Sequence, residues 1–129
     1  MGEVLFMRPL IEIEIACKAD KGIHPFAYVY DKAFSPFRLS ATKILEIGIK
    51  DGNSLRMWEE YFPNADIYGA DINPKSIFSD VRIDTILCDQ SKEKDIIHLI
   101  AKFGGGFDII IDDGSHLNND QQLSLQLLF

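Results

Sequence analysis

Residues 43–52, KILEIGIKDG, decide the fold of this chain. The first five residues form a short, mostly apolar run, which predicts a buried strand over 43–47. Gly48 and Gly52 then predict a tight turn, because glycine accepts positive φ and lets a ligand approach the backbone closely. Residues 54–62 follow with apolar side chains recurring on one helical face, which predicts a helix. The stretch is therefore typical of a strand, a ligand-binding turn and a helix.

The same alternation continues toward the end of the chain. Three further apolar runs predict strands over 66–70, 83–88 and 107–111. A helix is expected from a Ser91 cap to the glycines that begin at Gly104. Strands that alternate with helices form a parallel sheet covered by helices. The expected fold class is α/β, a Rossmann-like parallel sheet with flanking helices.

The sequence divides into two regions. Residues 1–42 are mixed in character and are expected to form a short helical N-terminal segment, and residues 43–129 are expected to form the Rossmann-like cofactor-binding half-domain. At 129 residues the chain has the length of one domain. Asn118 and Gln121 resemble a capping box for a last helix.

Composition narrows the function classes. The formal net charge of −7 makes nucleic acid an improbable partner, because an acidic domain does not attract phosphates through its overall field. The N-terminal residues do not have the pattern expected of a signal peptide, and no apolar run reaches membrane-spanning length. Cys17 and Cys88 match no metal-ligand spacing and fit reduced thiols, so a cytoplasmic protein without a membrane partner is expected.

Acidic residues follow the predicted strands. Asp71, Asp89 and Asp113 fall at the carboxyl ends of the second, third and fourth strands. Such sheets bind ligands beyond these ends, at a switch point. The carboxylate of Asp71 is in a position suited to accept hydrogen bonds from both hydroxyls of a ribose. Asp89 suits the amino group of adenine, and capping of the next helix is equally consistent with its position.

The fourth strand is followed by the densest polar cluster, DDGSH over residues 112–116. Carboxylates are ligands suited to Mg²⁺, and histidine can act as a general base near neutral pH. Asp113 and His116 are the candidates for these roles. The alternative is a polar turn in which Asp112 caps the backbone and His116 is merely exposed.

The turn itself discriminates between nucleotide cofactors. Its spacing is G-x-x-x-G over residues 48–52, which lacks the G-x-G-x-x-G pattern of dinucleotide sites. A dinucleotide needs a pyrophosphate site on the helix end, whereas a sulfonium nucleoside carries no phosphate. The looser turn therefore favours the sulfonium nucleoside, and a purely structural turn is an open alternative.

Three segments carry a family resemblance: ILEIGIKDGNSLRMWEEYFPNADIYGADINP (44–74), FDIIIDDGSH (107–116) and ADKGIHPFAYVYDKAF (19–34). With these, the chain resembles the class I S-adenosylmethionine-dependent methyltransferases. More narrowly, it is similar to the metal-dependent sugar O-methyltransferases of macrolide biosynthesis and their bacterial relatives. The resemblance implies S-adenosyl-L-methionine and Mg²⁺ as cofactors and a small-molecule hydroxyl as acceptor.

The resemblance also implies roles for cofactor-binding residues. Gly48 and Gly52, with Glu46 just before them, correspond to the cofactor loop. Asp71 corresponds to the ribose ligand, and Asp89 lies near the adenine.

For the reaction, the resemblance implies Asp113 as a metal ligand and His116 as the base that deprotonates the acceptor. Lys21, His24 and Tyr30 are candidates to cover the cofactor or substrate, and packing explains Tyr30 equally well. His98 is expected at the surface, in the middle of a helix.

One departure from the family is expected to matter. In the relatives a fifth strand ends in an acidic pair that completes the metal site, and here the chain ends at Phe129, before that strand. Either a longer gene product or a second chain is expected to supply it, and the open sheet edge makes a homo-oligomer plausible. The rival hypotheses are a non-catalytic cofactor-binding module, an NAD-dependent Rossmann oxidoreductase and, more distantly, a metal-dependent hydrolase.

Overall fold

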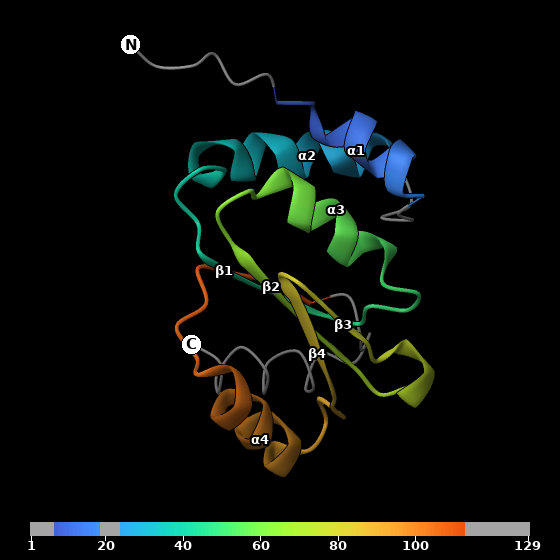
Figure 1. Ribbon diagram of the computed structural model, residues 1–129, viewed down its shortest axis with the longest axis vertical. Coiled ribbons are helices and arrows are strands. Elements are labelled where there is room, and N and C mark those ends of the chain that lie inside the picture. Colours follow the sequence, from blue (N-terminus) through green and yellow to red (C-terminus); the bar gives the residue numbers. More distant parts are fainter. Residues whose placement is uncertain (1–6, 19–23, 113–129) are drawn as a thin grey trace.

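The computed structural model describes the backbone of residues 7–18 and 24–112, and the side chains of 7–18 and 29–112. A five-stranded sheet lies between α1, α2 and α3 on one side and α4 on the other (Figure 1). The elements follow in the order α1 (Leu10–Cys17), α2 (His24–Phe34), η1 (Ser35–Phe37), β1 (Lys43–Ile47), α3 (Asn53–Tyr61), β2 (Asp66–Asp71), η2 (Pro74–Ser76), β3 (Ser79–Asp80), β4 (Ile83–Leu87), α4 (Glu93–Phe103) and β5 (Ile109–Asp112).

The strand order is β3-β4-β2-β1-β5. β1 pairs in parallel with β2 and β5, and β2 pairs in parallel with β4. The chain thus builds outward from β1 through β2 to β4 and then returns to place β5 on the other side of β1. This reversal is a topological switch point, and ligands of such sheets bind beyond the carboxyl ends of the strands there. The α/β fold class expected from the sequence is confirmed.

The sequence predicted four of the five strands in this sheet, and β3 was not among them. It has two exposed residues and pairs antiparallel with β4, Ser79 with Asp84 and Asp80 with Ile83. Two exposed residues contain no hydrophobic period, so the sequence pattern gave no signal for them.

Alternation along the strands divides the core between the two faces of the sheet. Ile44 of β1 packs with α1 and α3, whereas its neighbour Leu45 packs with α4. Leu10 and Ile13 of α1 are fully buried on the first face. The helices before residue 42 therefore share one core with the sheet.

Aromatic rings fill the space between α2 and α3. The Trp58 ring meets the Tyr30 ring edge-on at 5.8 Å and the Phe34 ring at 5.7 Å between centroids. Tyr30 also stacks on Phe34, at 5.5 Å. Of the two explanations for Tyr30, these contacts support packing.

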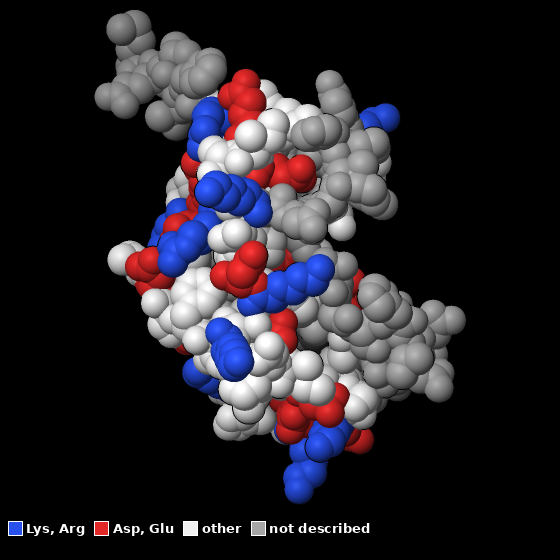
Figure 2. All heavy atoms as spheres, turned by 90° about the vertical axis from the view of Figure 1, so that its right-hand side faces the viewer, with Lys and Arg blue, Asp and Glu red and all other residues white. Residues whose placement is uncertain are grey.

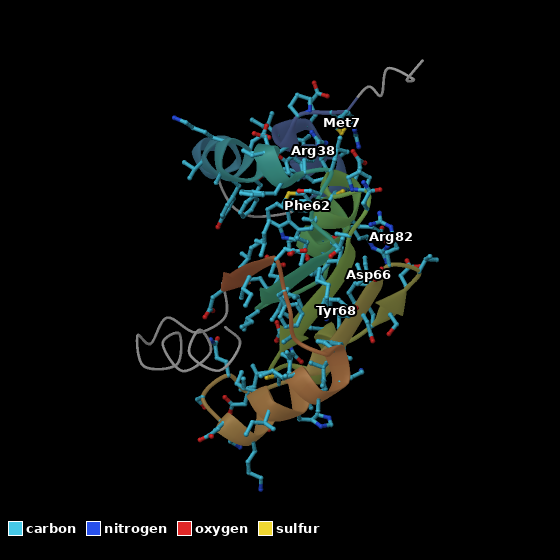
Figure 3. The ribbon with its side chains drawn as sticks, turned by 90° about the vertical axis from the view of Figure 1, so that its left-hand side faces the viewer. Met7, Arg38, Phe62, Asp66, Tyr68 and Arg82 are labelled. Atoms are coloured by element: carbon cyan, nitrogen blue, oxygen red, sulfur yellow. The ribbon has the colours of Figure 1, made fainter. Side chains whose placement is uncertain are left out.

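Cationic side chains close the C-terminal end of α3. Arg82 donates to the backbone carbonyls of Glu59, Phe62 and Ala65, and Arg38 donates to that of Tyr61 at 2.9 Å. Figure 3 shows Arg38, Phe62 and Arg82 around this end of the helix. Helix carbonyls without an intrahelical partner are thereby satisfied.

The ends of α4 agree only in part with the sequence. Gly104, at φ 88°, ends the helix as expected, and its N–H donates to the Ile100 carbonyl at 2.7 Å. The prediction that Ser91 caps this helix was wrong. Ser91 donates its hydroxyl to Asp89 at 2.6 Å, and α4 begins at Glu93 without a side-chain cap bond. The side chain of Ser91 is already used in the turn before the helix.

None of the described helices is long and apolar enough to cross a membrane. Cys17 and Cys88 are both free thiols. Burial raises the pKa of the Cys88 thiol to about 12.

Candidate cofactor site

Three strand ends meet at one edge of the sheet. Ile47, the last residue of β1, is in register with Ala70, and Asp71, the last residue of β2, is in register with Leu87 of β4. The loop that begins at Gly48 therefore lies beside the Asp71 carboxylate. Asp89 follows two residues after β4 and completes the same edge.

The loop from β1 to α3 has the unusual backbone that its glycines predicted. Gly48 and Gly52 have φ values of 87° and 82°. Lys50 between them has φ 49°, which is uncommon for a residue with a side chain. The Gly48 N–H donates to the Ala70 carbonyl at 2.8 Å and so extends the pairing of β1 with β2 into the loop.

Asp71 holds this loop. Its Oδ2 accepts from the backbone N–H groups of Ile49 at 2.9 Å and Lys50 at 3.0 Å. Its Oδ1 accepts from the N–H of Asn73 at 2.8 Å. The residue is partly exposed.

Glu46 lies underneath the loop, fully buried within β1. Its carboxylate accepts from the Ser54 hydroxyl and, at 3.5 Å, from the Trp58 indole N–H. Both partners belong to α3, so Glu46 ties β1 to the first turns of the helix that follows the loop. A buried carboxylate has to be hydrogen-bonded, and these donors meet that requirement.

Asp89 carries a stabilised negative charge. The side-chain hydrogen bond from Ser91, and next the backbone bond from the same residue at 3.0 Å, hold the pKa of Asp89 below its usual range. The N–H of Asp89 donates to the Asp95 carboxylate at 2.8 Å, which fixes the turn against the first turn of α4.

Two apolar side chains at this edge were missed from the sequence. Ile72, which follows Asp71 in the sequence, is 66% exposed. Leu87, which is in register with Asp71 on the neighbouring strand, is 51% exposed. Both are exposed aliphatic groups at the carboxyl ends of β2 and β4, where Asp71 and Asp89 also lie. A detectable signal was present at Ile72, since it stands between Asp71 and Asn73 in an otherwise polar turn.

The end of β5 is linked to the end of β4. The Gln90 amide donates to both oxygens of Asp112, at 3.3 and 3.1 Å, and Gln90 is buried. Asp113 and His116 come next in the sequence and lie outside the described residues, as do Lys21 and the expected capping box. Among the described side chains, those of residues 7–18 and 29–112, no group of three or more His, Cys, Asp or Glu could hold a metal.

The remaining histidines are placed by the backbone. His24 begins α2, and its side chain is not among those described. His98 is exposed in α4, as expected. On the face shown in Figure 2, basic and acidic side chains are interspersed, without a continuous basic patch on its visible described surface.

No family model matches the sequence. Among characterised relatives, mycinamicin VI 2''-O-methyltransferase of Micromonospora griseorubida is 41% identical over 114 residues, which are 83% of this chain and 28% of that protein. Demethylmacrocin O-methyltransferase of Streptomyces fradiae is 40% identical over 114 residues, 83% of this chain and 29% of that protein. L-olivosyl-oleandolide 3-O-methyltransferase of Streptomyces antibioticus is 34% identical over 130 residues, 94% of this chain and 33% of that protein.

Solved structures give the same result. The MycE methyltransferase from the mycinamycin biosynthetic pathway, in complex with Mg and SAH, has a TM-score of 0.85 and 36% identity over 96% of this chain and 34% of its own. A complex of the same protein with Mg, SAH and mycinamycin VI matches equally well, over 95% of this chain and 36% of its own. The chain spans about one third of the length of these proteins. Over that third, the chain is similar in sequence and in fold to these O-methyltransferases, which confirms the resemblance.

Proposed function

We propose that this chain is the cofactor-binding part of an S-adenosyl-L-methionine-dependent O-methyltransferase. The observation that carries the proposal is the shared edge of β1, β2 and β4, where a glycine loop, two carboxylates and two exposed aliphatic side chains lie together. A ribose, an adenine and an amino-acid tail need just these groups. The complexes of MycE with SAH support the same cofactor.

Each group has a distinct task in this proposal. Asp71 accepts a hydrogen bond from a ribose hydroxyl, and Asp89 accepts one from the adenine amino group. Ile72 and Leu87 contact the faces of the ring. The loop between Gly48 and Gly52 leaves the backbone open to the methionine part. Glu46, buried below, maintains the position of the loop through Ser54 and Trp58.

The reaction is proposed from the cluster after β5. His116 takes the proton from the acceptor hydroxyl as its oxygen attacks the methyl group, and the sulfonium leaves as a neutral thioether. Asp113 is the proposed ligand of a Mg²⁺ ion, which when bound lowers the pKa of the hydroxyl and orients it. A sugar hydroxyl on a natural product is the proposed acceptor, because the relatives are named for such substrates.

Calorimetric titration of the 129-residue chain with S-adenosylmethionine, with and without Mg²⁺, tests the proposal. Saturable binding is expected, with NAD under the same conditions giving none. A chain that is folded by circular dichroism and binds NAD in preference to S-adenosylmethionine would contradict it.

Location and assembly belong to the same proposal. Two free cysteines fit a reducing cytoplasm. β5 pairs with β1 along one edge, and within the described part of the chain its other edge has no strand partner. An open strand edge favours pairing with a strand of another molecule, so self-association is proposed here as well.

A further inference from the structure

One carboxylate joins two separate segments at the cofactor edge. Ile49 and Lys50 donate their N–H groups to Oδ2 of Asp71 from the loop after β1, at 2.9 and 3.0 Å. Asn73 donates to Oδ1 from the turn after β2, at 2.8 Å. Three backbone N–H donors therefore converge on the Asp71 side chain, for which the sequence predicted only a role in binding ribose.

The conformation of the loop explains why it needs such an anchor. Lys50 lies in the left-handed region at φ 49°, between two positive-φ glycines. A lysine adopts this region uncommonly, and glycines at both sides leave the unliganded loop many alternatives. An ionised acceptor for two successive N–H groups selects one of these conformations, because charge-assisted bonds are the stronger ones.

We infer that Asp71 positions the loop between β1 and α3 in the free protein, so that loop order and ribose recognition depend on the same carboxylate. A carboxylate has about four acceptor positions, and the backbone uses three of them. The remaining position, on Oδ1, accepts a ribose hydroxyl while the loop bonds stay in place. The loop role stands on the geometry alone, and its link to ribose rests on the proposed function.

Asp71→Asn tests the loop role without any ligand. An asparagine at this position turns one acceptor oxygen into an NH₂ donor that opposes a backbone N–H. Asp66→Asn is the matched control, since Asp66 is exposed, stands at the opposite end of β2 and has no side-chain hydrogen bond within the described residues (Figure 3).

Amide hydrogen exchange of the ligand-free chain is the first measurement. In Asp71→Asn, the amides of Ile49 and Lys50 are expected to exchange about tenfold faster or more, and those in Asp66→Asn to stay within about twofold of wild type. The strand amides of Leu45 and Ile67 serve as internal references and are expected to be unchanged. Unchanged exchange at 49 and 50, or equal acceleration at the reference amides, would overturn the loop role.

Nucleoside binding is the second measurement. S-adenosylhomocysteine and its analogue without ribose hydroxyls are titrated into wild type and Asp71→Asn. If Asp71 acted through ribose alone, both proteins would bind the analogue equally, and that result would overturn the inference. The expected result is binding of the analogue at least about fivefold weaker in Asp71→Asn. Wild type that binds no nucleoside yet shows the expected exchange pattern would overturn the proposed function and leave the loop role standing.

Discussion

The Phe78 ring lies directly over Gly52, so that a Cβ on Gly52 would come 2.5 Å from Cε1 of that ring. Gly52 has φ 82° and occupies the N-cap position of α3. Phe78 is held in turn by Thr85, whose hydroxyl accepts from the Phe78 N–H at 2.7 Å. The segment before β4 thus closes over the end of the loop between β1 and α3 and leaves room for no side chain there.

Gly52→Ala is therefore expected to be costly for two reasons. The left-handed backbone costs a residue with a Cβ about 1–2 kcal/mol. Overpacking against the ring adds about 1–3 kcal/mol. Gly106→Ala is the matched control, because Gly106 has φ 67° and its Cβ would meet no atom within 4 Å. Urea unfolding measures both, and equal losses would show that Phe78 moves aside freely.

Glu46→Ala is expected to destabilise the chain by about 3 kcal/mol, because it leaves a cavity and removes the acceptor for Ser54 and Trp58. Glu46→Gln keeps one acceptor oxygen and nearly the same volume, so it is expected to cost less. Unfolding midpoints in urea give both values. Equal losses for Gln and Ala would mean that the buried carboxylate itself, and not the retained volume and acceptor oxygen, governs stability here.

Arg82→Lys is expected to lower stability by about 1–2 kcal/mol, because a lysine cannot reproduce the planar fork that bonds three carbonyls at the end of α3. Arg56→Lys is the control: Arg56 is in an exposed ion pair with Asp80 at 3.0 Å, and its substitution is expected to cost at most about 0.5 kcal/mol. Thermal unfolding compares the two variants, and similar unfolding midpoints would contradict the capping role of Arg82.

These residues show where sequence reasoning stops. The alternation of apolar runs and helical faces was sufficient to predict β1, β2, β4 and β5, because burial on both sides of a parallel sheet produces that pattern directly. Polar contacts between distant residues leave no such period. The loop bonds of Asp71 and the cap of α3 by Arg82 join residues about 20 positions apart, and only the folded chain brings them together.

The candidate site divides in the same way. Asp71 and Asp89 were predicted from their places after strands, since carboxyl ends of parallel strands share one edge. Leu87 was missed because an exposed apolar residue is ordinary on any surface, and Ile72 was missed although its polar neighbours gave a signal. Ser91 was misplaced because serine forms local turns as readily as it caps helices.

Under the proposed function, His116→Ala is expected to reduce turnover by about 10²–10⁴, the usual contribution of a general base. S-adenosylmethionine binding is expected to change little, since the described cofactor groups lie on other strand ends. His98→Ala, at an exposed position of α4, is the control and should leave turnover unchanged. Steady-state kinetics with calorimetry separates the two effects, and unaltered turnover in His116→Ala would exclude the histidine as the base.

Asp108 gives the chain a predictable response to acid. Its Oδ2 accepts from the Thr42 N–H at 2.7 Å, the Lys43 N–H at 3.1 Å and the Thr42 hydroxyl at 3.1 Å. The backbone bonds from Thr42 and then Lys43 hold the pKa of Asp108 below its usual range. The folded-state pKa is thus lower than that of the unfolded chain, about 3.9. The stabilisation is complete well above that value and disappears as the pH falls through the folded-state pKa.

Asp108→Asn is accordingly expected to lower stability at pH 7 by about 1 kcal/mol, the low end for bonds to a charged group because the carboxylate is exposed. Below about pH 4 the difference from wild type should shrink, since wild type then loses the same charge. Thr42→Val keeps both backbone donors and should retain the pH dependence of wild type. Urea unfolding from pH 7 to 3 measures all three proteins. A gap between Asp108→Asn and wild type that stays constant over this range would mean that the bonds to Asp108 do not depend on its charge.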